Sequence, residues 1–379
     1  MVTAPVIEWH NAYDAGGWEW FQSVAQTAEG GYVGVGERYL LKIDAIGGIE
    51  WAIASSAQLS SIKVLADGSY IVAGQLGNGA YLAKYAFDGV LLWEKQYSKG
   101  SNSYASTVQP TSDGGFIVSG SAVTTTTSDY DFWLLKVDSL GNKTWEKTFG
   151  GAKADIAGEQ DNAVQQTSDG GYIVVGSTWT YVTQAYTSDV FVVRTDAFGN
   201  LKWQKNYGGT RSDFGYAIQQ TRDGGYIVVG HYDYSSDTDA YLLKLDGLGT
   251  IQWQKTYGGA LQDWGRSVFQ TSDGGYILGG RYSFSNTDWD FYLVKTDSLG
   301  NISWQNAYGG SLGELGYSLQ PTADGGFIFG GYTESFAQTN RDFYLIKLSS
   351  ASAFTQTGLA ASSPFQVRPI PLTQQRTPQ

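Results

Sequence analysis

Residues 214–257 read FGYAIQQTRDGGYIVVGHYDYSSDTDAYLLKLDGLGTIQWQKTY. Four runs rich in apolar and aromatic residues are separated by an Asp-Gly-Gly turn, a polar loop and a Gly-Leu-Gly turn. Runs of this length bounded by turn residues are typical of short β-strands. Two tight turns and one longer loop therefore predict an antiparallel sheet of four strands, called A, B, C and D here in chain order.

The same pattern recurs along the whole chain. Its first marker is an acidic residue followed by glycine and an apolar run, with weaker copies at Glu29 and Asp67 and clear copies at Asp113, Asp169, Asp223, Asp273 and Asp324. A second marker is a tryptophan four residues after a glycine, at Trp51, Trp93, Trp145, Trp203, Trp253 and Trp304. A four-stranded unit repeated about every 50 residues indicates a β-propeller. The sequence predicts an all-β, seven-bladed β-propeller of four-stranded antiparallel blades.

The seventh framework tryptophan is Trp9, which lies ahead of every turn motif. This offset predicts that the N-terminal strand, around residues 5–13, completes the last blade and closes the ring, so that no sheet edge is left open there. We expect the propeller to span residues 5–348. Residues 349–379, rich in Pro, Ser and Gln, are predicted to form an extended tail or linker.

The composition supports the all-β prediction and restricts the classes of partner that the protein can bind. Glycine (50 residues), Tyr (26), Phe (17) and Trp (13) suit short strands and tight turns. A net charge of −12 disfavours nucleic acid and anionic membranes as partners. The chain has no cysteine and no apolar stretch long enough to insert into a bilayer. Its N-terminus lacks the features of a signal peptide, so we expect an intracellular protein or the mature form of an exported one.

Three segments carry a resemblance to a known group of repeats: TSDGGYIVVG (167–176), DAYLLKLDGLG (239–249) and WQKNYGG (203–209). The pattern resembles the SBBP-type seven-bladed propeller repeats of secreted and cell-surface proteins of bacteria and archaea, over roughly residues 5–348. This resemblance implies the fold and a secreted or cell-surface location. The Gly-x-x-x-Trp element more distantly resembles the tryptophan-docking motif of quinoprotein propellers. Their chemistry is not implied, because those have eight blades and no matching set of cofactor ligands occurs here.

Loop lengths predict which face of the propeller is functional. The D-to-A and B-to-C connections emerge on one face, and all of the length variation lies in them. We call it the loop-rich face and expect the site there. The B-to-C connection is short in the first two units (36–42 and 74–84) and longer later (120–136 and 176–194). We therefore expect a low rim over the first two blades and a lopsided cleft.

Aromatic residues outside the framework concentrate in these connections. Trp18, Trp20 and Trp264 are predicted in D-to-A loops, and Trp179 and Trp289 in B-to-C loops. These side chains either pack loop against loop or form a platform that stacks sugar rings or holds a protein partner. The candidate ligand-binding residues are Trp20, Trp179, Tyr232, Tyr234, Trp264, Trp289, Asp213 and Asp263.

Carboxylates recur ten residues after the strand D tryptophan, at Glu19, Asp155, Asp213, Asp263 and Glu314. Recurrence favours a structural role, such as binding loop N–H groups; the alternative is a ring of acids that holds a cation. Further acidic pairs in the B-to-C loops offer the oxygen ligands that Ca²⁺ prefers, which makes Ca²⁺ the candidate cofactor. The candidate metal ligands are Asp129, Asp131, Asp237, Asp239, Asp288 and Asp290.

Candidates for catalysis are few. His231 opens a loop rich in Tyr and Asp, and Glu159 and Asp161 lie in a four-residue insertion found only in the fourth unit. A carboxylate pair for glycoside hydrolysis could be drawn from several of these acids, but no spacing singles one out. No nucleophile elbow, P-loop or zinc motif occurs in the sequence.

Three functions remain open at this point. The first is a non-enzymatic extracellular binding or scaffold propeller that recognises a glycan or a surface protein through its aromatic, acidic loop face. The second is a glycan-active hydrolase or lyase that uses rim carboxylates. The third is a structural subunit of an extracellular assembly, joined through the C-terminal tail or the aromatic rim.

Overall fold

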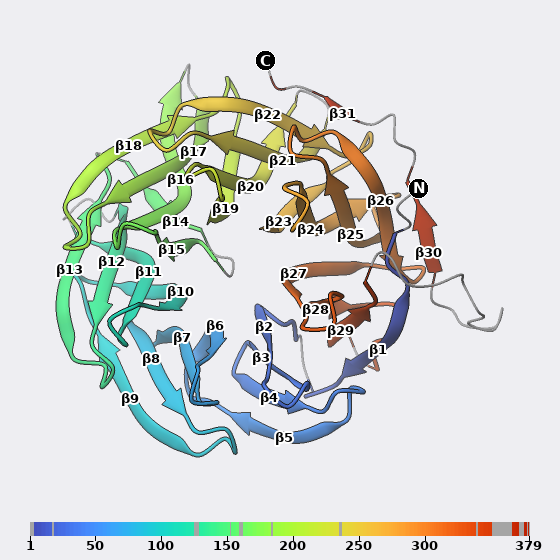
Figure 1. The fold of residues 1–379 in the computed structure, drawn as a ribbon, viewed down its shortest axis with the longest axis horizontal. Helices are drawn as coiled ribbons and strands as arrows, with labels where there is room; N and C mark the ends of the chain where they lie inside the picture. Colours follow the sequence, from blue (N-terminus) through green and yellow to red (C-terminus); the bar gives the residue numbers. More distant parts are fainter. Residues whose placement is uncertain are drawn as a thin grey trace.

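The computed structural model describes residues 4–16, 19–124, 129–151, 153–158, 162–182, 185–234, 237–338, 340–350, 366–370, 375–376 and 378. Its strands form seven antiparallel sheets arranged around a central axis (Figure 1). The protein is a seven-bladed β-propeller, as the repeat predicts. Among the described residues, no helix is long and apolar enough to cross a membrane.

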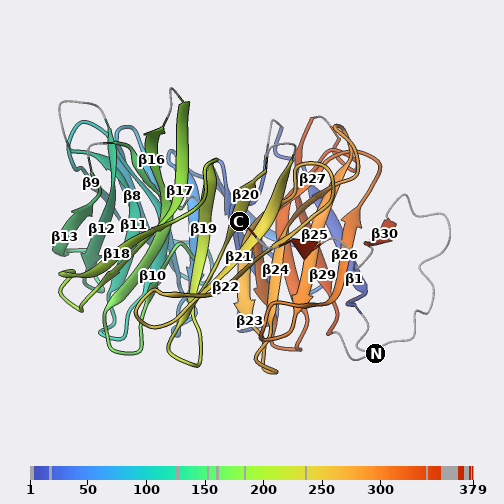
Figure 2. The same cartoon turned by 90° about the horizontal axis from the view of Figure 1, so that it is seen from above.

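Each blade begins with strand A beside the central axis and ends with strand D at the circumference (Figures 1 and 2). The A strands of blades 1 to 7 are β2 (Ser23–Gln26), β6 (Gln58–Val64), β10 (Ser103–Pro110), β14 (Asp155–Ala157) with β15 (Val164–Gln166), β19 (Asp213–Gln220), β23 (Trp264–Gln270) and β27 (Glu314–Pro321). The B strands are β3 (Tyr32–Gly36), β7 (Tyr70–Leu76), β11 (Phe116–Val123), β16 (Tyr172–Val182), β20 (Tyr226–Asp233), β24 (Tyr276–Ser283) and β28 (Phe327–Thr333).

The two outer positions complete each blade. The C strands are β4 (Tyr39–Ile43), β8 (Gly79–Tyr85), β12 (Tyr130–Val137), β17 (Ala185–Thr195), β21 (Thr238–Leu245), β25 (Trp289–Thr296) and β29 (Asp342–Leu348). The D strands are β5 (Ile49–Ala54), β9 (Leu91–Tyr97), β13 (Lys143–Phe149), β18 (Leu201–Tyr207), β22 (Ile251–Tyr257), β26 (Ile302–Gly309) and, in blade 7, β1 (Ile7–Tyr13).

The N-terminal strand closes the ring. Strand β1 pairs antiparallel with β29, with Trp9 opposite Lys347. Blade 7 thus takes its outer strand from the start of the chain and its other three strands from the end of the propeller (Figure 1). The closure predicted from the position of Trp9 is confirmed.

The framework tryptophans join neighbouring blades. Trp145 of blade 3 packs edge-on against Tyr172 of blade 4, with ring centroids 5.6 Å apart. It also lies over Gly199 in the C-to-D turn of blade 4, where φ is 75° and a Cβ atom would come within 2.7 Å of the indole. Glycine is therefore required at this turn both by its backbone conformation and by the tryptophan above it.

The basic residue of strand C has a structural role in each blade where its contacts are described. In five blades it forms an ion pair with the acid of the blade's own A-to-B turn: Lys84–Asp67, Lys136–Asp113, Lys244–Asp223, Lys295–Asp273 and Lys347–Asp324. Arg194 binds Asp169 in the same way, and Lys42 pairs instead with Glu50. Most of these cations are buried, so the paired carboxylate offsets the cost of their desolvation.

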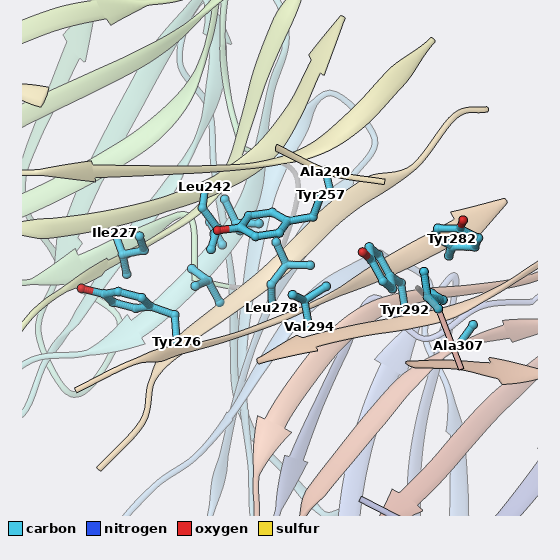
Figure 3. Close-up of a cluster of buried hydrophobic side chains, with 14 residues drawn as sticks. Ile227, Ala240, Leu242, Tyr257, Tyr276, Leu278, Tyr282, Tyr292, Val294 and Ala307 are labelled. Atoms are coloured by element: carbon cyan, nitrogen blue, oxygen red, sulfur yellow. The ribbon is translucent and has the colours of Figure 1, made fainter. Parts of the chain in front are cut away.

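Apolar side chains fill the space between blades. Figure 3 shows the cluster between blades 5 and 6, in which Leu242 and Tyr257 of one blade meet Tyr276, Leu278 and Tyr292 of the next. Tyr292 is fully buried, and its hydroxyl donates a hydrogen bond to Gln305 Oε1 at 2.6 Å. The core is thus divided into clusters shared by adjacent blades.

The described parts of the C-terminal segment lie along the circumference. Strand β30 (Gln366–Pro369) pairs antiparallel with β26 of blade 6, and β31 (Gln375–Arg376) pairs with β22 of blade 5. Ile370 is buried in the cluster between these two blades. The segment therefore covers the outer edges of two sheets, which would otherwise offer unpaired backbone groups.

Candidate functional site

The rim of the loop-rich face is uneven, as loop lengths predict. Strands β16 and β17 of blade 4 each have 11 residues, whereas β3 and β4 of blade 1 each have 5. Blade 1 therefore forms a low part of the rim, and blade 4 a taller part across the ring (Figure 1).

A pocket of about 430 Å³ opens at this low part of the rim. We call it the low-rim pocket; it is lined by Trp20, Gln22, Glu37, Gln58, Leu59, Ser60, Gly74, Gln75, Tyr104, Ala105, Ser106, Tyr130 and Ile156. Most of these residues belong to blades 1, 2 and 3, largely to their inner strands and the adjoining connections. Its volume lies within the range of ordinary small-molecule sites.

Aromatic side chains line the pocket from two different blades. Trp20 comes from the segment that leads into blade 1, and Tyr104 and Tyr130 come from blade 3. The two tyrosine rings pack with centroids 5.8 Å apart, and Asn102 Nδ2 donates a hydrogen bond to the Tyr130 hydroxyl at 2.7 Å. These contacts hold the tyrosine pair in place before any ligand binds.

Blade 2 contributes polar side chains to the same pocket. Gln58, Ser60 and Gln75 line it, and Ser60 Oγ donates a hydrogen bond to the Ala105 carbonyl of blade 3 at 2.8 Å. The Gln75 amide Nε2 donates to the Gly77 carbonyl at 3.1 Å. Amide side chains carry both hydrogen-bond donors and acceptors. This part of the pocket can therefore bind ligand hydroxyl groups either as donors or as acceptors.

Glu37 supplies the carboxylate of the pocket and has an unusual backbone. It lies between β3 and β4 with φ of 47°, in the left-handed region that favours glycine. Burial raises the pKa of its carboxyl group. A strained residue that lines a pocket is a candidate functional residue.

The predicted aromatic rim over blades 4 to 6 forms a stack. Trp179 meets Phe214 with centroids 6.0 Å apart, and the His231 ring lies 4.6 Å from Phe214 and 6.0 Å from Trp264. The Arg281 guanidinium then lies 4.4 Å from the Trp264 ring and 4.6 Å from the Trp289 ring. These side chains contact one another continuously across three blades, which supports the packing interpretation.

Three of these tryptophans are not in loops. The prediction that Trp179, Trp264 and Trp289 lie in connections is wrong, because they belong to β16, β23 and β25. The strands extend farther toward the rim than the apolar runs indicate, since the polar residues around them still pair along the sheet. Trp18 lies outside the described residues.

His231 is held as a neutral ring. It is buried, and the Tyr216 hydroxyl lies 3.1 Å from its Nδ1. Burial, followed by the nearby charge of Arg266, lowers its pKa to about 3. A histidine with this pKa stays uncharged at neutral pH, so it is a poor proton donor there.

The other predicted tyrosines lie near a second pocket, between blades 5 and 6. This pocket has a volume of about 400 Å³ and is lined by Tyr234, Asp237, Gln262, Arg281 and neighbouring polar residues. Tyr232 is buried beside Tyr234, with ring centroids 5.0 Å apart.

The carboxylates that recur after the strand D tryptophan bind loop N–H groups. Asp263 accepts hydrogen bonds from Gly259 N at 2.5 Å and Ser283 N at 2.7 Å. Asp213 accepts one from Gly209 N at 2.8 Å. Both aspartates are fully buried, and desolvation raises their pKa values, to about 8 for Asp263 and about 7 for Asp213.

Each of these acids faces a second acid on strand C of the preceding blade. The negative charges of Asp239 and Asp189 raise the pKa values of Asp263 and Asp213 further. Three more blades repeat this arrangement, with the pairs Asp131–Asp155, Asp290–Glu314 and Asp342–Glu19.

The predicted metal ligands fall into different surroundings. Asp131 and Asp239 belong to the acid pairs just described, Asp129 is half-buried near Asp155, and Asp237 lines the pocket between blades 5 and 6. Asp288 and Asp290 bind a cation of the protein itself, because Arg368 Nη1 lies 2.9 Å from Asp288 Oδ2 and Arg368 Nε lies 3.5 Å from Asp290 Oδ2.

The insertion of blade 4 reaches other blades near the axis. Glu159 and Asp161 lie outside the described residues, but Asn162 is described. Its side-chain oxygen accepts hydrogen bonds from Gln109 Nε2 of blade 3 at 2.7 Å and from Lys63 Nζ of blade 2 at 3.2 Å. Its carbonyl accepts one from Ile218 N of blade 5 at 3.0 Å.

The sequence did not single out most of the low-rim pocket. Trp20 is among the candidates from the sequence, but Tyr104, Tyr130, Gln58 and Gln75 are not. The sequence signal for this pocket is the shortness of the first two B-to-C connections. They predict the low rim, and the low rim is where the side chains of the inner strands become accessible.

Comparisons with known proteins show the fold. No protein-family model and no curated protein matches the chain. The WD40 domain of Neurospora crassa Pan2 matches at 12% identity and a TM-score of 0.60, covering 92% of this chain and 96% of that one. BamB from Moraxella catarrhalis matches at 9% identity and a TM-score of 0.51, covering 91% and 100%.

A third similar structure is that of Chaetomium thermophilum Sqt1 bound to the N-terminus of ribosomal protein L10. It matches at 11% identity and a TM-score of 0.50, covering 89% of this chain and 98% of that one. At these identities the likeness extends to the propeller fold alone. The resemblance to SBBP-type repeats stays a prediction.

Proposed function

We propose that this protein is a non-enzymatic binding propeller, secreted or displayed at the cell surface, and that it recognises a neutral glycan in the low-rim pocket. One observation carries the proposal: Trp20 and the Tyr104–Tyr130 pair line the same pocket as the amides of Gln58 and Gln75. Flat aromatic faces suit the apolar faces of sugar rings, and amides suit their hydroxyl groups.

The charges in the pocket favour a ligand without negative charge. Glu37 is its one ionisable carboxylate, and no lysine or arginine is among its lining residues in the described part of the chain. An anionic ligand would meet the Glu37 carboxylate and no lysine or arginine among the described lining residues. A neutral sugar can instead donate its hydroxyl groups to Glu37.

The placement of the carboxylates supports binding over hydrolysis. Glycoside hydrolysis ordinarily needs two carboxyl groups on either side of the scissile bond. Asp213 and Asp263 accept hydrogen bonds from loop N–H groups and do not line the low-rim pocket. Glu37 alone cannot supply both roles.

A protein partner is the second candidate. It is favoured by the protein ligands present in structures of similar propellers. The structure of Sqt1 contains the N-terminus of ribosomal protein L10. The structure of BBS1N, solved in complex with ARL6DN, matches this chain at 11% identity and a TM-score of 0.56. A peptide with a free amino terminus would place a positive charge near Glu37. This argument is an analogy at the level of fold.

A binding screen separates the two candidates. The wild-type protein is applied to an array of neutral and acidic oligosaccharides and, in parallel, to a library of peptides with free and acetylated N-termini. We expect selective binding to neutral oligosaccharides. Binding to free N-termini alone would favour the protein partner, and selective binding to acidic sugars would contradict the proposal.

A further inference from the structure

Three acidic residues converge where the ring closes. Asp14 follows β1, Glu19 precedes β2, and Asp342 is the first residue of β29. One carboxylate oxygen from each lies within 4.8 Å of the others. The group therefore connects the outer strand and strand C of blade 7 to the entry of blade 1.

This junction differs from the other acid pairs of the propeller. Asp342 and Glu19 correspond to pairs such as Asp290 and Glu314, and both are buried. Beside Asp290 the third charged group is the guanidinium of Arg368. At the ring closure the third group is another carboxylate, Asp14, so negative charge accumulates where a cation lies in blade 6.

A second observation points to a ligand at this group. Asp342 is fully buried, and its Oδ2 accepts a hydrogen bond from Gln338 N at 2.9 Å. Its Oδ1 is also buried and has no hydrogen-bond partner in the described part of the chain. A buried carboxylate oxygen without a partner is costly unless a cation or a proton satisfies it.

We propose that Asp14, Glu19 and Asp342 bind a Ca²⁺ ion that ties the last blade to the first. Ca²⁺ accepts carboxylate oxygens in flexible geometry, whereas transition metals generally favour histidine or cysteine ligands, which this group lacks. Three carboxylates also supply enough negative charge for a divalent ion. We expect a dissociation constant on the order of 10⁻⁴ to 10⁻³ M, as for extracellular calcium modules.

The effect of the ion on folding follows from its position. Bound Ca²⁺ stabilises the folded state because the three ligands come together only when the ring is closed. At about ten times the dissociation constant, the melting temperature should rise by about 1–3 °C. This inference is independent of what the low-rim pocket binds.

The test uses the full chain after treatment with a chelator. Calorimetric titration with CaCl₂ and thermal melts in CaCl₂ are compared for wild type, Asp14→Asn, Asp342→Asn and the control Asp131→Asn. Asp14 is exposed, so Asp14→Asn should fold even if Asp342→Asn does not. Asp131 belongs to the acid pair of blade 3 and should leave the calcium response unchanged.

We expect saturable Ca²⁺ binding in wild type and Asp131→Asn, with affinity at least tenfold weaker in Asp14→Asn. Absence of binding to wild type at millimolar Ca²⁺ would overturn the proposal. So would an unchanged affinity in Asp14→Asn, or a rise in melting temperature that NaCl of the same ionic strength reproduces, since that would be charge screening alone.

Discussion

Arg368 Nη1 lies 2.9 Å from Oδ2 of Asp288, 80 residues earlier in the chain. The same guanidinium reaches the buried Asp290, and β30 pairs with the outer strand of blade 6. The C-terminal segment is therefore attached to the propeller by both backbone pairing and charge. It cannot be removed without uncovering a sheet edge and leaving two carboxylates without their cation.

We expect Arg368→Ala to lower the free energy of unfolding by about 1–3 kcal/mol, because Asp288 would lose its hydrogen bonds to the guanidinium and the C-terminal segment would lose its charged contact with blade 6. Urea denaturation at pH 7 measures the change. The matched control is Lys202→Ala, which removes an ion pair with Asp169 whose side chains are 46% and 48% exposed. The control should change stability by less than about 0.5 kcal/mol. Equal effects of both variants would show that Arg368 forms only a surface contact.

Two adjacent glycines should respond very differently to the same substitution. A Cβ atom on Gly150 would lie 2.6 Å from Asp155 Oδ2 and even closer to Asp131, whereas one on Gly151 would meet nothing within 4 Å. Gly150→Ala should therefore destabilise the protein by about 1–3 kcal/mol, since the two acids are packed beneath it. Gly151→Ala should stay within about 0.5 kcal/mol of wild type. Thermal melts of both variants test the prediction, and a neutral Gly150→Ala would contradict the close packing of this acid pair.

The buried acid pairs predict that stability falls as pH rises from about 4 to 8. Burial raises the pKa values of Asp213, Asp263 and Asp290 in the folded state to about 7, 8 and 8. The folded state thus holds these protons more tightly than the unfolded chain does. Their contribution is complete below about pH 4, the pKa of the unfolded chain. It declines as pH rises above that value and is fully lost once pH has passed the folded pKa values of about 7 to 8.

The acidic residues of the A-to-B turns change stability in the opposite direction with pH. The pKa values of Asp113, Asp223, Asp273 and Asp324 are lowered to about 2, with hydrogen bonds and ion pairs outweighing desolvation. Their contribution is lost as pH falls from about 4 to 2. We therefore expect maximum stability near pH 4, with a decline on both sides, measured by urea denaturation from pH 2 to 9.

A single variant tests the origin of the decline between pH 4 and 8. Asp239→Asn removes the negative charge beside Asp263, so the pKa of Asp263 should fall and the loss of stability between pH 6 and 8 should become shallower, by about 1 kcal/mol. Asp88→Asn, at an exposed turn, serves as the control. A pH profile of Asp239→Asn identical to that of wild type would exclude this acid pair as the cause.

The fold could be predicted from the sequence because its determinants are local and repeated. Gly199 is required both by its turn and by the tryptophan of the preceding blade, and Trp9 ahead of the first turn motif predicts the ring closure. These residues recur at fixed spacing, so each copy supports the assignment of the others.

The candidate site could be predicted only in part, because it depends on contacts between blades. Nothing in the local sequence around Tyr104 indicates that Asn102 fixes Tyr130 beside it, or that Trp20 lines the same pocket. Trp264 and Trp289 have the composition of a binding platform, yet Arg281 fills the space between them. The pairing of Arg368 with Asp288 is also long-range and leaves no periodic signal.

The most direct test of the proposed function is the dissociation constant of the best neutral oligosaccharide from the screen, measured by calorimetry for wild type, Tyr104→Ala and the control Trp289→Ala. Loss of one aromatic contact in the low-rim pocket should weaken binding at least tenfold in Tyr104→Ala, while Trp289→Ala should bind like wild type. Wild-type affinity in Tyr104→Ala, together with a loss in Trp289→Ala, would place the binding site on the aromatic stack of blades 4 to 6 and contradict this account.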